Sequence, residues 1–196
     1  YHRAMDERLP VAGEFYYAST GTWWANRFYP VPEGLVVFAT NITEQRNAEK
    51  AQQASLRFLE IMHKHAETGP LLEELAAGIK DYTGCDSVAI RVLDEAGNIP
   101  YHAYKGFSTK FVEMESPLSI NSDQCMCINV IKGTTNSQLP FYTKGGSFYM
   151  NATTRFLATV SEKEKGKTRN ICNKEGYESV ALVPFVSGGR ILGLIH

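Results

Sequence analysis

The spacing of apolar and polar positions changes at residues 40–45, where strand-like segments give way to a helical pattern. Upstream, three segments rich in aromatic and β-branched side chains are separated by turn residues, which predicts three antiparallel strands. These segments are residues 14–19, 22–30 and 34–40. Downstream, few helix-breaking residues occur before Gly69, which predicts a helix over residues 41–67. We expect Asn41 to cap this helix and Glu44 to complete a capping box.

The apolar positions of this connecting helix recur at spacings of three and four residues. They are Ala51, Ala54, Phe58 and Ile61, and the stripe is widened toward its C-terminal end by Leu56, Leu59 and Met62. Such a stripe is typical of a helix that pairs with a parallel copy of itself near its start and packs against a domain toward its end. We therefore expect a homodimer formed through this helix, with a solvated linker as the alternative.

The remainder of the chain predicts an α+β fold. Residues 71–82 repeat apolar positions at helical spacing and end at Thr83-Gly84, which predicts an amphipathic helix. Two pairs of strands follow, one directly after this helix and one at the end of the sequence. They are residues 88–93, 99–103, 179–186 and 191–196. We expect an antiparallel sheet with flanking helices, interrupted by a long excursion over residues 116–176.

Composition narrows the class of protein. The chain has 196 residues, of which 43% are hydrophobic and 21% are charged, enough for one complete domain and part of another. The formal net charge of −1 provides no attraction to nucleic acid or to anionic membranes. No long apolar run or signal-peptide pattern occurs, and four cysteines fit a reducing compartment. We therefore expect a cytoplasmic protein with no nucleic-acid partner and no direct membrane contact.

Three of the four cysteines, Cys125, Cys127 and Cys172, lie in the excursion, and three alternatives remain open for them. They are metal-binding thiolates, a redox pair, or small buried apolar side chains. Their spacing differs from the Cys-x-x-Cys knuckles of structural zinc sites. If residues 124–132 form a helix, Cys125 and Cys127 point to opposite sides of it. If these residues are extended, both sulphurs share a face, and chelation or a disulfide with Cys172 becomes feasible.

Other residues of the excursion are candidates for ligand binding. A glycine turn is expected to place Phe148 against the sheet, with Asn151 opening a helix. Arg169 and Glu178 flank Cys172 and are expected to form an ion pair, while Arg169 is alternatively suited to an anionic ligand. Together with the three cysteines, the candidate site residues are Phe148, Asn151, Arg169 and Tyr177.

The first part of the chain, residues 1–46, resembles the C-terminal half of a PAS sensor domain. The matching segments are a helix end at residues 1–5, then residues 23–30, residues 34–38 and the Asn-Ile-Thr-Glu ending at residues 41–44. The family usually has Asp where Asn41 stands, so the capping oxygen is kept and the charge is lost. The N-terminal half of a PAS fold is absent, which implies a sheet with exposed apolar surface unless a partner chain covers it.

The second part, residues 56–196, resembles a GAF domain in the order of its helices and hairpins. Four motifs narrow this resemblance to a subfamily found in PAS- and GAF-bearing sensor histidine kinases of anaerobic bacteria and methanogenic archaea. They are Cys-Met-Cys at 125–127, Gly-Gly-Ser-Phe at 145–148, Thr-Arg-Asn-Ile-Cys at 168–172 and Gly-Tyr-Glu-Ser at 176–179. The resemblance implies that residues 47–67 are a connecting signalling helix and that the GAF domain is trimmed at its C-terminal end.

The resemblance implies a sensory module of a histidine kinase, which senses a small ligand or redox state and signals along helices to a kinase domain in the parent chain. The fragment itself is then not an enzyme. Haem held by a GAF cysteine is an implied cofactor, but Asn173 is a poor axial ligand, so His102 or a cysteine would have to serve. GAF-type methionine sulfoxide reductases also use several cysteines, yet their catalytic pattern is not matched. A ligand-free dimerisation module is the remaining alternative.

Overall fold

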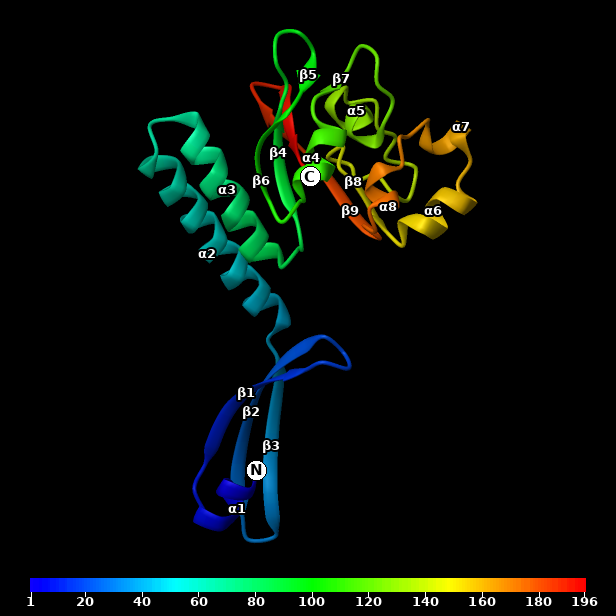
Figure 1. Ribbon diagram of the computed structural model, residues 1–196. Helices are drawn as coiled ribbons and strands as arrows, with labels where there is room; N and C mark the ends of the chain where they lie inside the picture. The colour runs from blue at the N-terminus through cyan, green and yellow to red at the C-terminus, as the bar shows by residue number, and fades with distance from the viewer. The chain divides into compact units, whose positions relative to one another are not determined.

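The computed structural model describes residues 1–196 and divides the chain into two units, Tyr1–Leu59 and Glu60–His196 (Figure 1). Helix α2, Thr43–Lys64, begins in the first unit and ends in the second. No helix in the chain combines the length and apolar character that a membrane span requires.

The first unit is a short helix followed by a three-stranded antiparallel sheet, as the alternating pattern predicted. Its elements are α1 (His2–Glu7), β1 (Val11–Tyr17), β2 (Thr22–Val31) and β3 (Gly34–Asn41). The strands lie in the order β1-β2-β3, and Trp24 on β2 pairs with Phe15 on one side and Asn41 on the other. Many aromatic side chains of this sheet are exposed, including Phe15, Tyr16 and Phe38.

The helix α2 is tied to the central strand of this sheet at its first turn. Asn41 Oδ1 accepts a hydrogen bond from the Thr43 N–H at 3.0 Å, and Thr43 Oγ1 accepts one from the Trp23 N–H at 2.9 Å. Asn41 therefore supplies a capping oxygen, as expected, but from the last position of β3. Arg46 on the first turns of α2 pairs with Glu14 on β1 and lies over the Trp23 ring.

The second unit is built on a five-stranded antiparallel sheet in the order β6-β4-β10-β9-β8. These strands are β4 (Val88–Val92), β6 (Tyr101–Lys105), β8 (Phe148–Asn151), β9 (Ser179–Ser187) and β10 (Arg190–Ile195). A small pair, β5 (Asn98–Ile99) and β7 (Leu118–Ser119), lies beside it. The predicted hairpins are confirmed, and β10 joins them because it pairs with both β4 and β9.

One face of this sheet is covered by helix α3, Thr68–Thr83. Ala76 of α3 packs with Ile90 of β4 and Ala103 of β6 in a small apolar cluster. The helix ends where predicted, at Gly84, whose φ of 70° suits glycine and whose N–H bonds to the Lys80 carbonyl. Its start differs from the prediction, because Pro70 lies inside the first turn, where a missing N–H costs nothing.

Short helices cover the other face (Figure 1). They are α4 (Thr109–Glu115), which comes just before the excursion, and four helices within it, α5 (Met126–Ile131), α6 (Thr153–Thr159), α7 (Glu162–Lys165) and α8 (Ile171–Lys174). Alternation along β4 directs Ile90 toward α3, whereas its neighbours Ala89 and Arg91 face the opposite side of the sheet. There Ala89 packs with Phe111 of α4, and Arg91 donates to the Glu115 carbonyl. The main core lies on this second face and includes Phe148 and Leu182. Antiparallel sheet and flanking helices confirm the predicted α+β fold.

Two predicted helices differ from those observed. The apolar stripe of α2 is split, because Ile61 is buried whereas Leu56, Leu59 and Met62 are exposed. The helix considered over residues 124–132 extends only from Met126 to Ile131. Asp123 lies before it, and its carboxylate accepts the Ser119 N–H at 2.7 Å.

Candidate functional site

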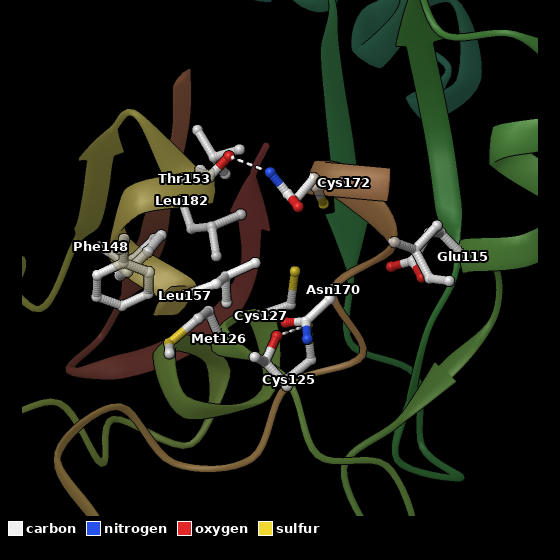
Figure 2. A pocket seen from close by; sticks show the side chains of 15 residues that line it. Glu115, Cys125, Met126, Cys127, Phe148, Thr153, Leu157, Asn170, Cys172 and Leu182 are labelled. Carbon is white, nitrogen blue, oxygen red and sulfur yellow. Dashed lines mark hydrogen bonds between the residues drawn. The ribbon is translucent and has the colours of Figure 1, made fainter. Parts of the chain in front are cut away.

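A small cavity of about 50 Å³ lies beneath the excursion, lined by α5, α6, α8 and strands β8 and β9 (Figure 2). Its walls carry three of the four cysteines, Cys125, Cys127 and Cys172, together with apolar side chains such as Phe148 and Leu182. The structure therefore brings the three predicted cysteines to one place. Pockets that bind ordinary organic ligands span roughly 300–1,000 Å³, so this cavity admits only a very small molecule.

The position of Cys125 just before α5 explains why both sulphurs of the Cys-x-Cys motif reach the cavity. Cys125 is extended, with φ −158° and ψ 164°, whereas Cys127 lies within the first turn. The condition for placing the two on opposite sides, a helix that includes Cys125, is not met, and Cys125 has the extended backbone of the other alternative. Both line the same cavity (Figure 2).

The Cys125 sulphur is surrounded by hydrogen-bond donors. The Cys127 thiol and the backbone N–H groups of Cys127 and Arg169 donate to it, and the Thr168 hydroxyl lies 3.8 Å away. These donors, led by the Cys127 thiol, outweigh the effect of burial and lower the pKa of Cys125 to about 5. The lowered pKa favours the thiolate of Cys125, which is the reactive form of cysteine.

The other two cysteines of the cavity remain thiols. Donation to Cys125, together with burial, raises the pKa of Cys127 well above its ordinary value. Burial and the neighbouring Cys125 and Glu115 raise the pKa of Cys172 to about 12. The Cys172 sulphur lies 3.7 Å from Nε2 of His196, and burial lowers the pKa of this histidine to about 3, so it is neutral. The site thus combines one thiolate with two thiols.

A fully buried arginine supports the wall of the site. Arg91 donates through Nη1 to the Ile99 carbonyl at 2.6 Å and through Nη2 to the Glu115 carbonyl at 2.7 Å. Its guanidinium lies 3.6 Å from the centre of the Tyr101 ring. Sequence reasoning treated residues 88–93 only as a strand and missed this residue. A charged residue inside an otherwise apolar strand was the signal that could have found it.

Arg169 forms a different ion pair from the one expected. Its Nε lies 3.1 Å from the Glu115 carboxylate, its Nη1 lies 3.4 Å from Asp123, and its Nη2 donates to the Met114 carbonyl. These partners occupy the guanidinium, so the structure does not support Arg169 as a ligand for a free anion. Burial raises the pKa of Glu115, and Cys125 adds to this effect, while Arg169 opposes it.

Glu178, the partner expected for Arg169, holds the start of α6 instead. Its carboxylate accepts the Thr154 N–H at 3.0 Å and also contacts the Thr154 hydroxyl. The prediction failed because nearness to Cys172 in sequence does not decide which side of the excursion a carboxylate occupies.

The remaining candidates are spread over the unit. Phe148 is buried and lines the cavity, as predicted. Asn151 is exposed at the end of β8. Tyr177 lies away from the cavity, with its hydroxyl 3.2 Å from Ser87 Oγ and its ring against Phe107. Asn170, which sequence reasoning did not select, lines the cavity and holds a left-handed backbone with φ 61°.

Neither a metal cluster nor haem fits the residues present. No group of three or more His, Cys, Asp or Glu side chains is arranged to hold a metal ion. The cavity of about 50 Å³ is far smaller than a macrocycle needs, and His102, suggested as an axial ligand, is exposed on β6. The metal and haem alternatives for the cysteines therefore lose their support.

Comparisons with known proteins establish the fold. No family model matches the sequence, and no curated protein matches it. Similar solved structures include the GAF domain of a phosphoenolpyruvate-protein phosphotransferase from Coxiella burnetii, with a TM-score of 0.54, 14% identity, and coverage of 76% of this chain and 77% of that chain. The nlh2 GAF domain of A. aeolicus in an inactive state has a TM-score of 0.50 and 12% identity, covering 76% and 78%.

A third similar structure is an enzyme, the free methionine-R-sulfoxide reductase of Neisseria meningitidis in complex with its substrate. Its TM-score is 0.51 at 14% identity, with coverage of 75% of this chain and 72% of that chain. At such low identities these likenesses show the fold and not the activity. The chain has a GAF-like α+β fold.

Proposed function

We propose that this chain is a sensory region whose GAF-like unit responds to redox state through Cys125 and Cys127. The observation that supports this proposal is that Cys125 and Cys127 line one cavity of about 50 Å³, where the pKa of Cys125 is lowered beside Cys127. Oxidation of a thiolate needs little space, whereas an organic effector of ordinary size does not fit. The redox alternative is therefore favoured over a larger small-molecule ligand.

A change at Cys125 has a direct structural consequence for its surroundings. The backbone N–H of Arg169 donates to the Cys125 sulphur, and the Arg169 side chain binds Glu115. Glu115 in turn accepts from Arg91 on β4, whose neighbour Ile90 packs against α3. Loss of the thiolate removes the acceptor at one end of this chain of contacts. We propose that the resulting shift reaches α3 and then α2.

In the parent protein, this shift would act on a histidine kinase output domain. Oxidation must favour a second arrangement of the helices, because a signal requires differential stabilisation of two states. We further propose that two copies associate through α2, where Leu56, Leu59 and Met62 are exposed in one stripe. Such a dimer would let a change in one unit alter the spacing of two helices.

The test compares the reduced chain with the chain oxidised by monochloramine, a thiol oxidant small enough for the cavity because nitrogen and chlorine are its only atoms besides hydrogen. Mass spectrometry locates the modified cysteines, and hydrogen exchange follows α3, β4 and residues 168–170. We expect oxidation at Cys125 and faster exchange in all three segments, and no change in a Cys125→Ser variant. Oxidation of Cys125 that leaves exchange in α3 and β4 unaltered would contradict the proposal.

We propose that the chain has no catalytic turnover of its own. The methionine sulfoxide reductase alternative predicts steady consumption of free methionine sulfoxide in the presence of a thiol reductant. Sensory function predicts at most one oxidation event per molecule. Multiple turnovers that disappear in Cys125→Ser would replace the sensory proposal with an enzymatic one.

A further inference from the structure

An unpaired hydrogen-bond acceptor lies on the wall of the cysteine cavity. Asn170 Oδ1 is buried and has no partner, and Asn170 lines the cavity beside Cys125 and Cys127 (Figure 2). A buried amide oxygen without a partner is unfavourable. Asn tolerates the left-handed backbone found at Asn170, with φ 61° and ψ 16°, better than most residues other than glycine. The unpaired amide oxygen on the cavity wall is therefore the feature that indicates an acceptor held ready for a donor.

The cavity limits how large that donor molecule is. By the same measure of volume, one water molecule needs about 10–15 Å³, so 50 Å³ holds only a few non-hydrogen atoms. The molecule must donate a hydrogen bond to Asn170 and reach the thiolate of Cys125. Hydrogen peroxide meets these conditions, since it has two oxygen atoms, each with an O–H donor, and an O–O bond that a thiolate attacks.

We propose that Cys125 reacts with hydrogen peroxide in this cavity, that Asn170 Oδ1 orients the peroxide, and that Cys127 forms the resulting disulfide. This inference rests on the proposed redox-sensing function and names its oxidant. Asn170 acts as a positioning residue, because it contacts the oxidant without taking part in bond changes.

The chemistry balances in two steps. The Cys125 thiolate attacks one peroxide oxygen, the O–O bond breaks, and the other oxygen leaves as hydroxide and takes up a proton to become water. Cys125 is thereby oxidised to a sulfenic acid. The Cys127 sulphur then attacks the Cys125 sulphur, forming the S–S bond, and the hydroxyl leaves as water with the thiol proton. Two thiols and one peroxide give one disulfide and two waters.

Cys127 is the partner expected for this second step. It is two residues from Cys125 in the chain, and both side chains line the cavity. Cys172 lies in the same cavity, but its sulphur is next to His196 at 3.7 Å. The exposed Cys85 lies outside the cavity and serves as an internal reference for ordinary thiol reactivity.

The first experiment exposes the 196-residue chain to hydrogen peroxide and identifies the products by mass spectrometry. We expect a Cys125–Cys127 disulfide in the unmodified chain. In Cys127→Ser, we expect a Cys125 sulfenic acid, trapped by dimedone. Cys125→Ser should leave Cys127 and Cys172 reduced. A Cys125–Cys172 disulfide as the main product of the unmodified chain would overturn the assignment of Cys127.

The second experiment tests Asn170 with a substitution that suits its backbone. Asn170→Gly removes the amide and relieves the positive φ, and Ala152→Gly, at φ 58°, is a matched control that relieves the same kind of backbone without removing an acceptor. We expect the peroxide rate constant of Cys125 to fall about tenfold in Asn170→Gly and to stay within twofold in Ala152→Gly. The rate with methyl iodide should stay within twofold in both variants, because this small alkylating agent has no hydrogen-bond donor for Asn170.

Equal losses with peroxide and methyl iodide would mean that Asn170 only shapes the site, and the positioning role would be overturned. Peroxide reacting no faster at Cys125 than at Cys85, while monochloramine still alters hydrogen exchange in α3, would overturn the choice of oxidant and leave redox sensing intact. Oxidation of Cys125 by monochloramine without any change in exchange would overturn the proposed function itself.

Discussion

The two units of this chain build similar antiparallel sheets from aromatic-rich strands but use the aromatic side chains in opposite ways. On the sheet of the first unit, Phe38 is 60% exposed, whereas Phe148 on the sheet of the second unit is 3% exposed. The difference lies in the second layer. A sheet buries its apolar face only against another element, and the excursion supplies that layer in the second unit. Only a closed unit of this kind can hold a buried thiolate.

The largest expected contrast concerns the two arginines that contact aromatic rings, Arg91 in the second unit and Arg46 in the first. Arg91→Ala leaves the Ile99 and Glu115 carbonyls without their buried donor, so we expect a loss of about 4 kcal/mol in unfolding free energy. Arg46→Ala removes an exposed pair with Glu14 and should change stability little. Hydrogen exchange in β4 measures the stability change in Arg91→Ala, and exchange in β2 measures the change in Arg46→Ala. A small effect of Arg91→Ala would show that the site does not depend on it.

Truncation of an apolar side chain should also cost more stability in the second unit than in the first. Leu182 is 1% exposed on β9, and Leu182→Ala should cost about 3 kcal/mol through lost contacts and the cavity left behind. Val37→Ala on the open sheet, where Val37 is 48% exposed, should cost well under about 1 kcal/mol. Denaturant unfolding monitored by exchange in each unit gives both values. Equal losses would mean that the first sheet is covered in solution.

A third contrast is in pH dependence, because the first unit contains no cysteine. The pKa of Cys125 is about 5 when folded and roughly 8.5 in an unfolded chain. Its stabilising contribution is therefore present above about pH 8.5 and is lost as the pH falls toward 5. Cys127 and Cys172 have raised pKa values, so their effect on stability has the opposite pH dependence. Their stabilising contribution is present below about pH 8.5 and is lost as the pH rises above it.

Between pH 8 and pH 5, we expect the unfolding free energy of the second unit to fall by roughly 2 kcal/mol more in the unmodified chain than in the Cys125→Ser variant. The variant titrates all the same carboxylates and histidines, so the difference isolates the thiolate. Hydrogen exchange in β9 at the two pH values provides the measurement. If both proteins lose the same amount, Cys125 is not a thiolate in the folded state.

The smallest effect is expected on association through α2. Leu59→Lys places a charge in the exposed stripe and should weaken a dimer about tenfold, or about 1.4 kcal/mol. Leu9→Lys introduces the same charge at another exposed leucine, outside α2, and should leave association unchanged. Sedimentation velocity over a concentration series gives both dissociation constants. A chain that stays monomeric throughout the series would remove the dimer proposal.

The sequence predicted elements with local signals better than it predicted the site. The Thr83-Gly84 helix end and both hairpins follow from local rules, and they are confirmed. The meeting of Cys125, Cys127 and Cys172 was offered only as an alternative, because it depends on one backbone conformation at Cys125. The Arg169 pairing was wrong, since Glu115 and Asp123 approach through folding of distant segments. Asn170 carries no local signal, because its burial arises from contacts made only in the folded unit.

The central place of β10 has a consequence for how the chain is synthesised. β10 lies between β4 and β9 in the sheet, although it follows both in sequence. Until residues 190–195 emerge from the ribosome, the strand pairs β6-β4 and β9-β8 have no partner that unites them. Such non-local pairing forms slowly. We therefore expect Cys125, Cys127 and Cys172 to stay open to solvent, and to depend on cellular reductants, until β10 has been made.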